Sequence, residues 1–163
     1  MRAVLERLDL VARAGSMRET RAMTVTESRV AGAFVDAIIA RDFARAVALL
    51  HPEIDFRAMT PNRVWEAEGP AGVEAVLRTW LDDPDEDVEG IEPTEPSSIE
   101  DTVRVGWLVR VSDVDGPHIF EQQAYVRERD AQIDWMRVMC SGWIPLPQGE
   151  PALSAVSTAP GAS

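Results

Sequence analysis

The sequence contains no lysine, one cysteine, one tyrosine, two histidines and no long apolar run. Because every basic residue is therefore an arginine, lysine Schiff-base chemistry and a phosphate-binding loop ending in Gly-Lys are excluded. The single cysteine, Cys140, cannot form an internal disulfide, which is typical of a reducing compartment. No stretch approaches the ~20 apolar residues of a membrane helix. The first ten residues carry too many charges for a signal peptide, so we expect a cytoplasmic protein without a membrane partner.

The charge balance excludes further classes of partner. The formal net charge of -12 repels phosphate backbones, and no basic stripe interleaved with aromatic residues is present, so we expect no nucleic-acid partner. Two histidines and one cysteine do not make a spaced metal site. The acids of the segment 82–96 are adjacent rather than spaced along a loop, which favours a solvated linker over a metal site. We therefore predict no metal and no cofactor.

The length of 163 residues predicts one domain with extensions. Residues 1–22 carry five arginines against three acids, and we expect a poorly ordered extension there. The alternatives are a basic arm or amphipathic helix that docks on a partner, or translation that starts at Met17 or Met23. Residues 23–144 form the predicted domain. Residues 145–163 are rich in Pro, Ala, Ser and Gly without periodicity, which predicts a disordered tail.

Local patterns predict helices followed by strands. A capping box at Thr24 and Glu27 opens one helix, and Asp42 opens a second, short one that Pro52 ends. A third helix is expected with Gly69 just before it, Pro70 at its first position and an apolar face that runs to Leu81. Alternating apolar residues predict a strand over 53–59, a short strand over 88–91, and an antiparallel meander over 102–112, 118–127 and 132–140. Helices gathered on one side of an antiparallel sheet make an α+β domain.

Three segments carry a family resemblance: "ARDFARAVALLHPEIDF", the helix opening "EGPAGVEAVL" and the closing "YVRERDAQIDWMRV". In this order and spacing, residues 26–143 resemble the nuclear transport factor 2-like superfamily and, within it, the SnoaL-like proteins. The resemblance implies a cystatin-like cone, in which a curved antiparallel or mixed sheet wraps around three N-terminal helices and an apolar pocket opens at one end. Members include polyketide cyclases, ketosteroid isomerases, limonene epoxide hydrolases and non-catalytic binding modules, so the resemblance implies a shape more than an activity.

The catalytic patterns of these relatives are incomplete in this chain. Where a ketosteroid isomerase has its aspartate base and its tyrosine, the resemblance places Ala58 and Phe34. The final aspartate of the epoxide hydrolases corresponds to Val138. The resemblance alone leaves open whether the chain is an enzyme.

The remaining polar candidates lie on the strand at 118–127. Counting back from Ile133 through a turn of equal length places Gln123 at the isomerase's donor acid and points Glu121 into the cone. The alternative is a one-residue slip that exposes both and buries Phe120 and Ala124. The other predicted pocket residues are Phe34, Phe56, Ala58, Trp65, Val76, Trp80, Met136, Val138 and Cys140. The outer face of the sheet is rich in large apolar residues, which predicts a homodimer.

Three functions follow as hypotheses. The first is binding of a small hydrophobic molecule in the cone, with Glu121 and Gln123 as polar anchors. The second is a polyketide cyclase-like or isomerase-like enzyme in which Glu121 takes a proton and Gln123 donates a hydrogen bond to a carbonyl. The third is a dimeric interaction module whose cone is filled.

Overall fold

The computed structural model describes residues 28–147, which form three helices and eight strands. In chain order these are α2 (Arg29–Ile39), α3 (Phe43–Ala48), β1 (Leu50–Thr60), β2 (Arg63–Glu68), α4 (Gly69–Leu81), β3 (Asp87–Pro93), β4 (Ser97–Ile99), β5 (Thr102–Asp113), β6 (Gly116–Arg129), β7 (Gln132–Cys140) and β8 (Ile144–Pro145). The predicted extension 1–22 lies outside the described residues, as do the capping box at Thr24 and most of the predicted tail.

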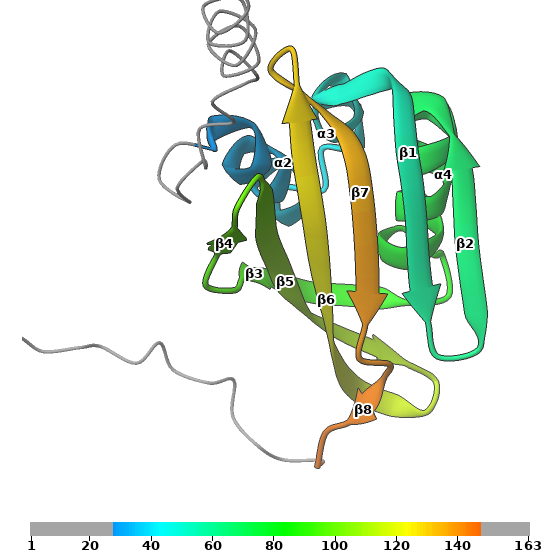
Figure 1. The fold of residues 1–163 in the computed structure, drawn as a ribbon. Coiled ribbons are helices and arrows are strands. Elements are labelled where there is room, and N and C mark those ends of the chain that lie inside the picture. The colour runs from blue at the N-terminus through cyan, green and yellow to red at the C-terminus, as the bar shows by residue number, and fades with distance from the viewer. Residues whose placement is uncertain (1–27, 148–163) are drawn as a thin grey trace, which may run out of the picture.

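The strands form one curved mixed sheet, and the helices pack on its inner side (Figure 1). The strand order is β2-β1-β7-β6-β5-β3, while β4 pairs with β5 and β8 pairs with β6. Only the β1–β7 pair is parallel; the other pairs are antiparallel. The predicted fold class, a curved α+β sheet wrapped around helices, is therefore confirmed. No helix within residues 28–147 is long and apolar enough to cross a membrane.

Side-chain caps explain where the first two helices begin. Ser28 caps α2, because its hydroxyl accepts a hydrogen bond from the backbone N–H of Ala31 at 3.3 Å. The predicted Asp42 cap of α3 is confirmed, since its carboxylate accepts from the N–H of Arg45 at 3.0 Å. Both helices bury one apolar face against the sheet, as amphipathic helices do.

The start of β1 differs from the prediction. Pro52 was expected to end the second helix, but α3 ends at Ala48 and β1 already begins at Leu50. The pairing of β1 with β7 shifts register between Leu50 and Asp55. Since proline has no N–H to donate to a sheet ladder, this interruption accommodates Pro52 inside the strand. Strand β2 was not predicted, and β8 extends the sheet past the expected domain boundary at residue 144.

The narrow part of the cone is filled with apolar side chains. Six of the residues predicted to line the pocket are almost fully buried in this core: Phe34, Phe56, Ala58, Val76, Met136 and Val138. Phe34, at the position of the isomerase's tyrosine, packs on Trp107 with ring centroids 6.2 Å apart. The prediction that these residues face inward is confirmed, but they build the core and not the wall of the main cavity.

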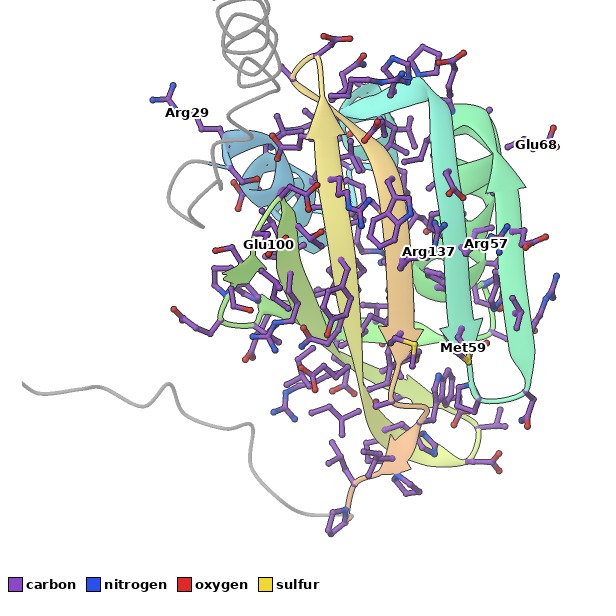
Figure 2. All side chains as sticks on the ribbon, in the orientation of Figure 1. Arg29, Arg57, Met59, Glu68, Glu100 and Arg137 are labelled. Carbon is purple, nitrogen blue, oxygen red and sulfur yellow. The ribbon has the colours of Figure 1, made fainter. Side chains whose placement is uncertain are left out.

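The outer face of the sheet combines ion pairs with exposed apolar side chains. Arg57, Met59 and Arg137 project from the outer face of β1 and β7 (Figure 2). Arg137 pairs with Asp55 at 2.7 Å, so the predicted outward direction of Asp55 and Arg57 is confirmed. Met59 is one of three exposed apolar residues on this face, and the other two are Val64 and Met139.

Gly106 of β5 supplies a test of the sheet packing. A Cβ at this position would lie 2.7 Å from the Gln122 carbonyl oxygen, 2.7 Å from Thr94 Oγ1 and 2.9 Å from Gln123 Cδ. Because backbone is one of these neighbours, we expect Gly106→Ala to lower the free energy of unfolding by about 1–3 kcal/mol in urea denaturation. Gly90→Ala on β3 is the control, since no atom lies within 4 Å of its Cβ position. Equal stability of the two variants would contradict this packing.

Candidate functional site

The main cavity opens at the wide end of the cone and has a volume of about 410 Å³. Its walls come from the β1–β2 turn, from β2, from the end of α4, from the loop before β3, and from β6, β7 and the segment leading to β8. Its lining includes Trp65, Trp80, Glu86, Phe120, Gln122, Cys140 and Trp143. Segments distant in the sequence therefore converge on one hollow.

A bulge in β7 lets Ile133 and Val138 both face inward, opposite the same alternating set of β6 residues. Ile133 pairs with Glu128, whereas the next pair along the ladder is Trp135 with Arg127, so Asp134 is an extra residue on β7. Beyond the bulge, the inward-facing Val138 pairs with Ala124. If β7 had no bulge, the ladder that pairs Ile133 with Glu128 would continue to a pair of Val138 with Gln123.

The predicted inward orientation of Glu121 and Gln123 is therefore wrong, and the alternative that buries Phe120 and Ala124 is correct. Glu121 and Gln123 share the opposite face of β6, where the Gln123 amide donates to Glu121 and, at 3.3 Å, to Thr94 Oγ1. Neither residue lines the main cavity. A catalytic or anchoring role for them inside the cone has no geometric support.

Gln122 takes the inward position instead and is held by a buried hydrogen bond. Trp107 Nε1 donates to Gln122 Oε1 at 2.8 Å, and these two residues are direct partners in the β5–β6 ladder. Gln122 is 1% exposed. The amide oxygen accepts from Trp107, and the amide nitrogen has two N–H groups to donate, one of which serves the Cys140 thiol. Gln122 is the polar residue that the β6 strand contributes to the cavity wall.

Aromatic rings form most of the apolar wall. Trp65 and Trp80 meet edge to face with centroids 5.7 Å apart, and Phe120 and Trp143 lie parallel with centroids 6.2 Å apart. Trp65 is oriented by a 2.9 Å hydrogen bond from its Nε1 to Thr60 Oγ1. Trp80 Nε1 is buried and has no hydrogen-bond partner within residues 28–147, which leaves an unsatisfied donor beside the cavity.

A close backbone approach holds the Trp143 segment in place. Gly142 has a φ of +81°, and a Cβ there would lie 2.7 Å from Pro61 Cγ in the β1–β2 turn. Only glycine fits both the backbone conformation and the contact. The turn and the Trp143 segment thus close against each other at the cavity rim.

Cys140 and Glu86 are the two titratable residues in the lining. Burial raises the pKa of the Cys140 thiol, partly offset by hydrogen bonds from the Gly142 backbone and the Gln122 side chain. The thiol is therefore held protonated and is a poor nucleophile. Burial also raises the pKa of the Glu86 carboxyl, and the neighbouring charges of Asp83, Asp113 and Asp85 raise it further. No hydrogen bond or ion pair to the Glu86 carboxylate occurs within the described part of the chain.

Three of the predicted pocket residues do line the cavity: Trp65, Trp80 and Cys140. Sequence reasoning missed Glu86, Phe120, Gln122 and Trp143 as lining residues. A signal for the β6 residues existed, because Phe120, Gln122, Ala124 and Val126 form an uncharged alternating set while the other set includes Glu121 and Arg127. No local pattern distinguishes Glu86 from the acids around it.

The raised pKa of Glu86 predicts a pH-dependent effect of Glu86→Gln. Because the folded chain disfavours the ionised carboxyl, the folded state of the wild type is most stable, relative to the unfolded state, below the ordinary pKa of 4.5. This contribution to stability is lost as the pH rises through the raised pKa. We expect Glu86→Gln to have a higher Tm than wild type at pH 7.5, with the difference shrinking toward pH 4. Glu89→Gln, an exposed site with the same charge change, is the control in differential scanning calorimetry. A Tm gain no larger than that of the control would contradict the assignment.

No protein-family model and no curated protein matches this sequence. Solved structures do resemble the fold. An NTF2-like protein of unknown function from Mesorhizobium loti has a TM-score of 0.54 at 17% identity, over 69% of this chain and 88% of that one. A putative ketosteroid isomerase from Kribbella flavida has a TM-score of 0.52 at 15% identity, over 86% and 94%.

An LEH-like epoxide hydrolase from M. tuberculosis has a TM-score of 0.51 at 15% identity, over 69% of this chain and 80% of that one. At such identities the likeness concerns the backbone arrangement and carries no residue roles. The curved sheet, the enclosed helices and these structural neighbours establish that residues 28–147 adopt the nuclear transport factor 2-like, ketosteroid isomerase-like fold.

Proposed function

We propose that this chain is a SnoaL-like protein that binds a small, largely apolar molecule in the cavity at the wide end of the cone. The observation that carries the proposal is a hollow of about 410 Å³ walled by Trp65, Trp80, Phe120 and Trp143. This volume is within the range of small-molecule sites, which combine apolar walls with few polar groups. The structural neighbours support a small-molecule-binding or isomerase-type domain at the level of fold.

Two polar groups supply the anchoring. The Gln122 amide is held by Trp107, so it meets a ligand oxygen without losing further side-chain freedom. Trp80 Nε1 is a second donor in this wall, and it is closed to solvent unless the indole turns. A ligand acceptor that reached it would recover part of the cost of burying that donor. We therefore expect the ligand to carry at least one oxygen acceptor on an apolar body.

A proton-transfer enzyme is the second candidate function. It is favoured by one observation, the raised pKa of Glu86, because a carboxyl with a raised pKa is better suited to accept and return a proton near neutrality. In this version Glu86 takes the role first expected of Glu121. Its test is exchange of the α-protons of a bound ketone in D₂O, followed by NMR: loss of exchange in Glu86→Gln supports it, and exchange at the uncatalysed rate in wild type overturns it.

A filled interaction module, the third hypothesis, requires that the cavity bind nothing. We expect a panel of steroids, aromatic polyketides and terpenoids to include ligands that raise the Tm and change tryptophan fluorescence, because three tryptophans line the hollow. Cys140→Phe places a ring in the hollow and should weaken such binding at least about tenfold. Ile99→Phe adds the same ring at an exposed site on β4 and serves as the control. If no compound of the panel binds wild type, the binding proposal fails and the filled module gains.

We also propose that two copies associate through the outer face of the sheet. Met59, Val64 and Met139 are 48%, 66% and 47% exposed there, and their burial in a partner would remove this apolar surface from water. We expect the chain to sediment as a dimer and Met59→Glu/Met139→Glu to sediment as a monomer, because like charges would face each other across a two-fold axis. Val114→Glu, at a turn residue that is 98% exposed, is the control. A monomeric wild type would contradict the proposal.

A further inference from the structure

The cavity carries an unbalanced negative charge. Glu86 is its one carboxylate, and no arginine or histidine is among its lining residues. Asp83, Asp85 and Asp113 lie close enough to Glu86 to shift its titration, and the chain as a whole has a formal charge of -12. A negative cleft with low-dielectric walls concentrates cations from solution. Within the described residues, this negative charge has no cationic partner.

The walls are of the kind that stabilises organic cations. Three indoles and one phenyl ring line the cavity, and the face of a tryptophan attracts a cation more strongly than any other side-chain ring. Arg63 already illustrates this, because its guanidinium carbon lies 3.6 Å from the Trp65 ring centroid. A cation inside would meet the rings and the carboxylate together.

Two other kinds of cation fit the site less well. Residues 28–147 contain no group of three or more His, Cys, Asp or Glu side chains that could hold a metal ion. A primary ammonium group would need several acceptors for its three N–H donors, whereas Glu86 is the one charged acceptor in the lining. A methylated ammonium group needs no such acceptors and presents methyl groups to the rings.

We propose that the ligand of this cavity carries a methylated ammonium group, with Glu86 as its counter-charge and the tryptophan-rich wall as its cage. This inference rests on the proposed binding function and names its substrate class: a small, partly apolar organic cation with an oxygen acceptor for Gln122. Binding favours the ionised form of Glu86, so the affinity rises as pH increases through the pKa of Glu86.

Other charged or ionisable side chains lie on the elements around Glu86. Asp83 and Asp85 belong to its own loop, Asp87 begins β3, and Asp113 ends β5. His118 on β6 lies 3.7 Å from Asp113. None of these neighbours lines the main cavity, whereas Glu86 does. Replacing Glu86 therefore removes the charge in the cavity lining and leaves the neighbouring charges in place.

The test compares choline with 3,3-dimethylbutan-1-ol, which replaces the quaternary nitrogen by carbon and is otherwise the same shape. Tryptophan fluorescence and ligand-observed NMR give both dissociation constants at pH 7.5. We expect choline to bind wild type at least about tenfold more tightly than its neutral counterpart. Glu86→Gln should lose most of this preference while the affinity for the neutral alcohol stays within about twofold. Glu89→Gln, which removes the same charge from an exposed residue outside the lining, should keep the preference.

The outcomes separate the two proposals. If the neutral alcohol or a neutral compound of the earlier panel binds while choline binds no better, the cation inference is overturned and the binding function stands. If choline binds tightly but equally to wild type and Glu86→Gln, the assigned role of Glu86 is overturned. Failure of choline, the alcohol and the panel together overturns the cation inference and the binding function alike.

Discussion

The buried hydrogen bond from Trp107 to Gln122 is the interaction on which the architecture of the site depends. A glutamine inside an apolar core is costly unless its oxygen is satisfied, and the indole of the paired strand satisfies it. The bond joins two direct partners of the β5–β6 ladder, so a one-residue slip would leave both groups buried without a partner. It thereby keeps Phe120, Gln122 and Ala124 on the inner face.

The filled narrow part of the cone and its open wide end follow from the same packing. Large side chains of α2, α4 and the inner sheet face meet in the narrow part and pack into one apolar core. At the wide end, tryptophans from β2, α4 and the β7–β8 segment cover the rim without filling it. The isomerase base position is a methyl group, Ala58, inside the filled part. This position therefore offers no group that could accept a proton.

Electrostatics at the rim differ from those on the outer face. On the outer face, carboxylates such as Asp55 pair with arginines, and Arg137 lowers the pKa of Asp55. Near the cavity, Glu86 lies among aspartates and has no cationic partner within residues 28–147. The contrast places an uncompensated charge beside the aromatic hollow, which is the arrangement that links the proposed binding function to a cationic ligand.

Local patterns in the sequence were sufficient for the features that depend on neighbouring residues. The Asp42 cap of α3, the apolar faces of the helices, the inward valines of β5 and the outward Asp55 and Arg57 follow from periodicity and capping chemistry, and the family resemblance correctly implied the curved α+β fold. The tertiary structure alone decided the rest. The bulge at Asp134 depends on how β7 pairs with β6, and it brings Met136 and Val138, in place of Trp135 and Arg137, to the inner face beside Ile133. Glu86 reaches the cavity because long-range packing places its loop there, and nothing in an acidic, proline-containing segment distinguishes one carboxylate from the next.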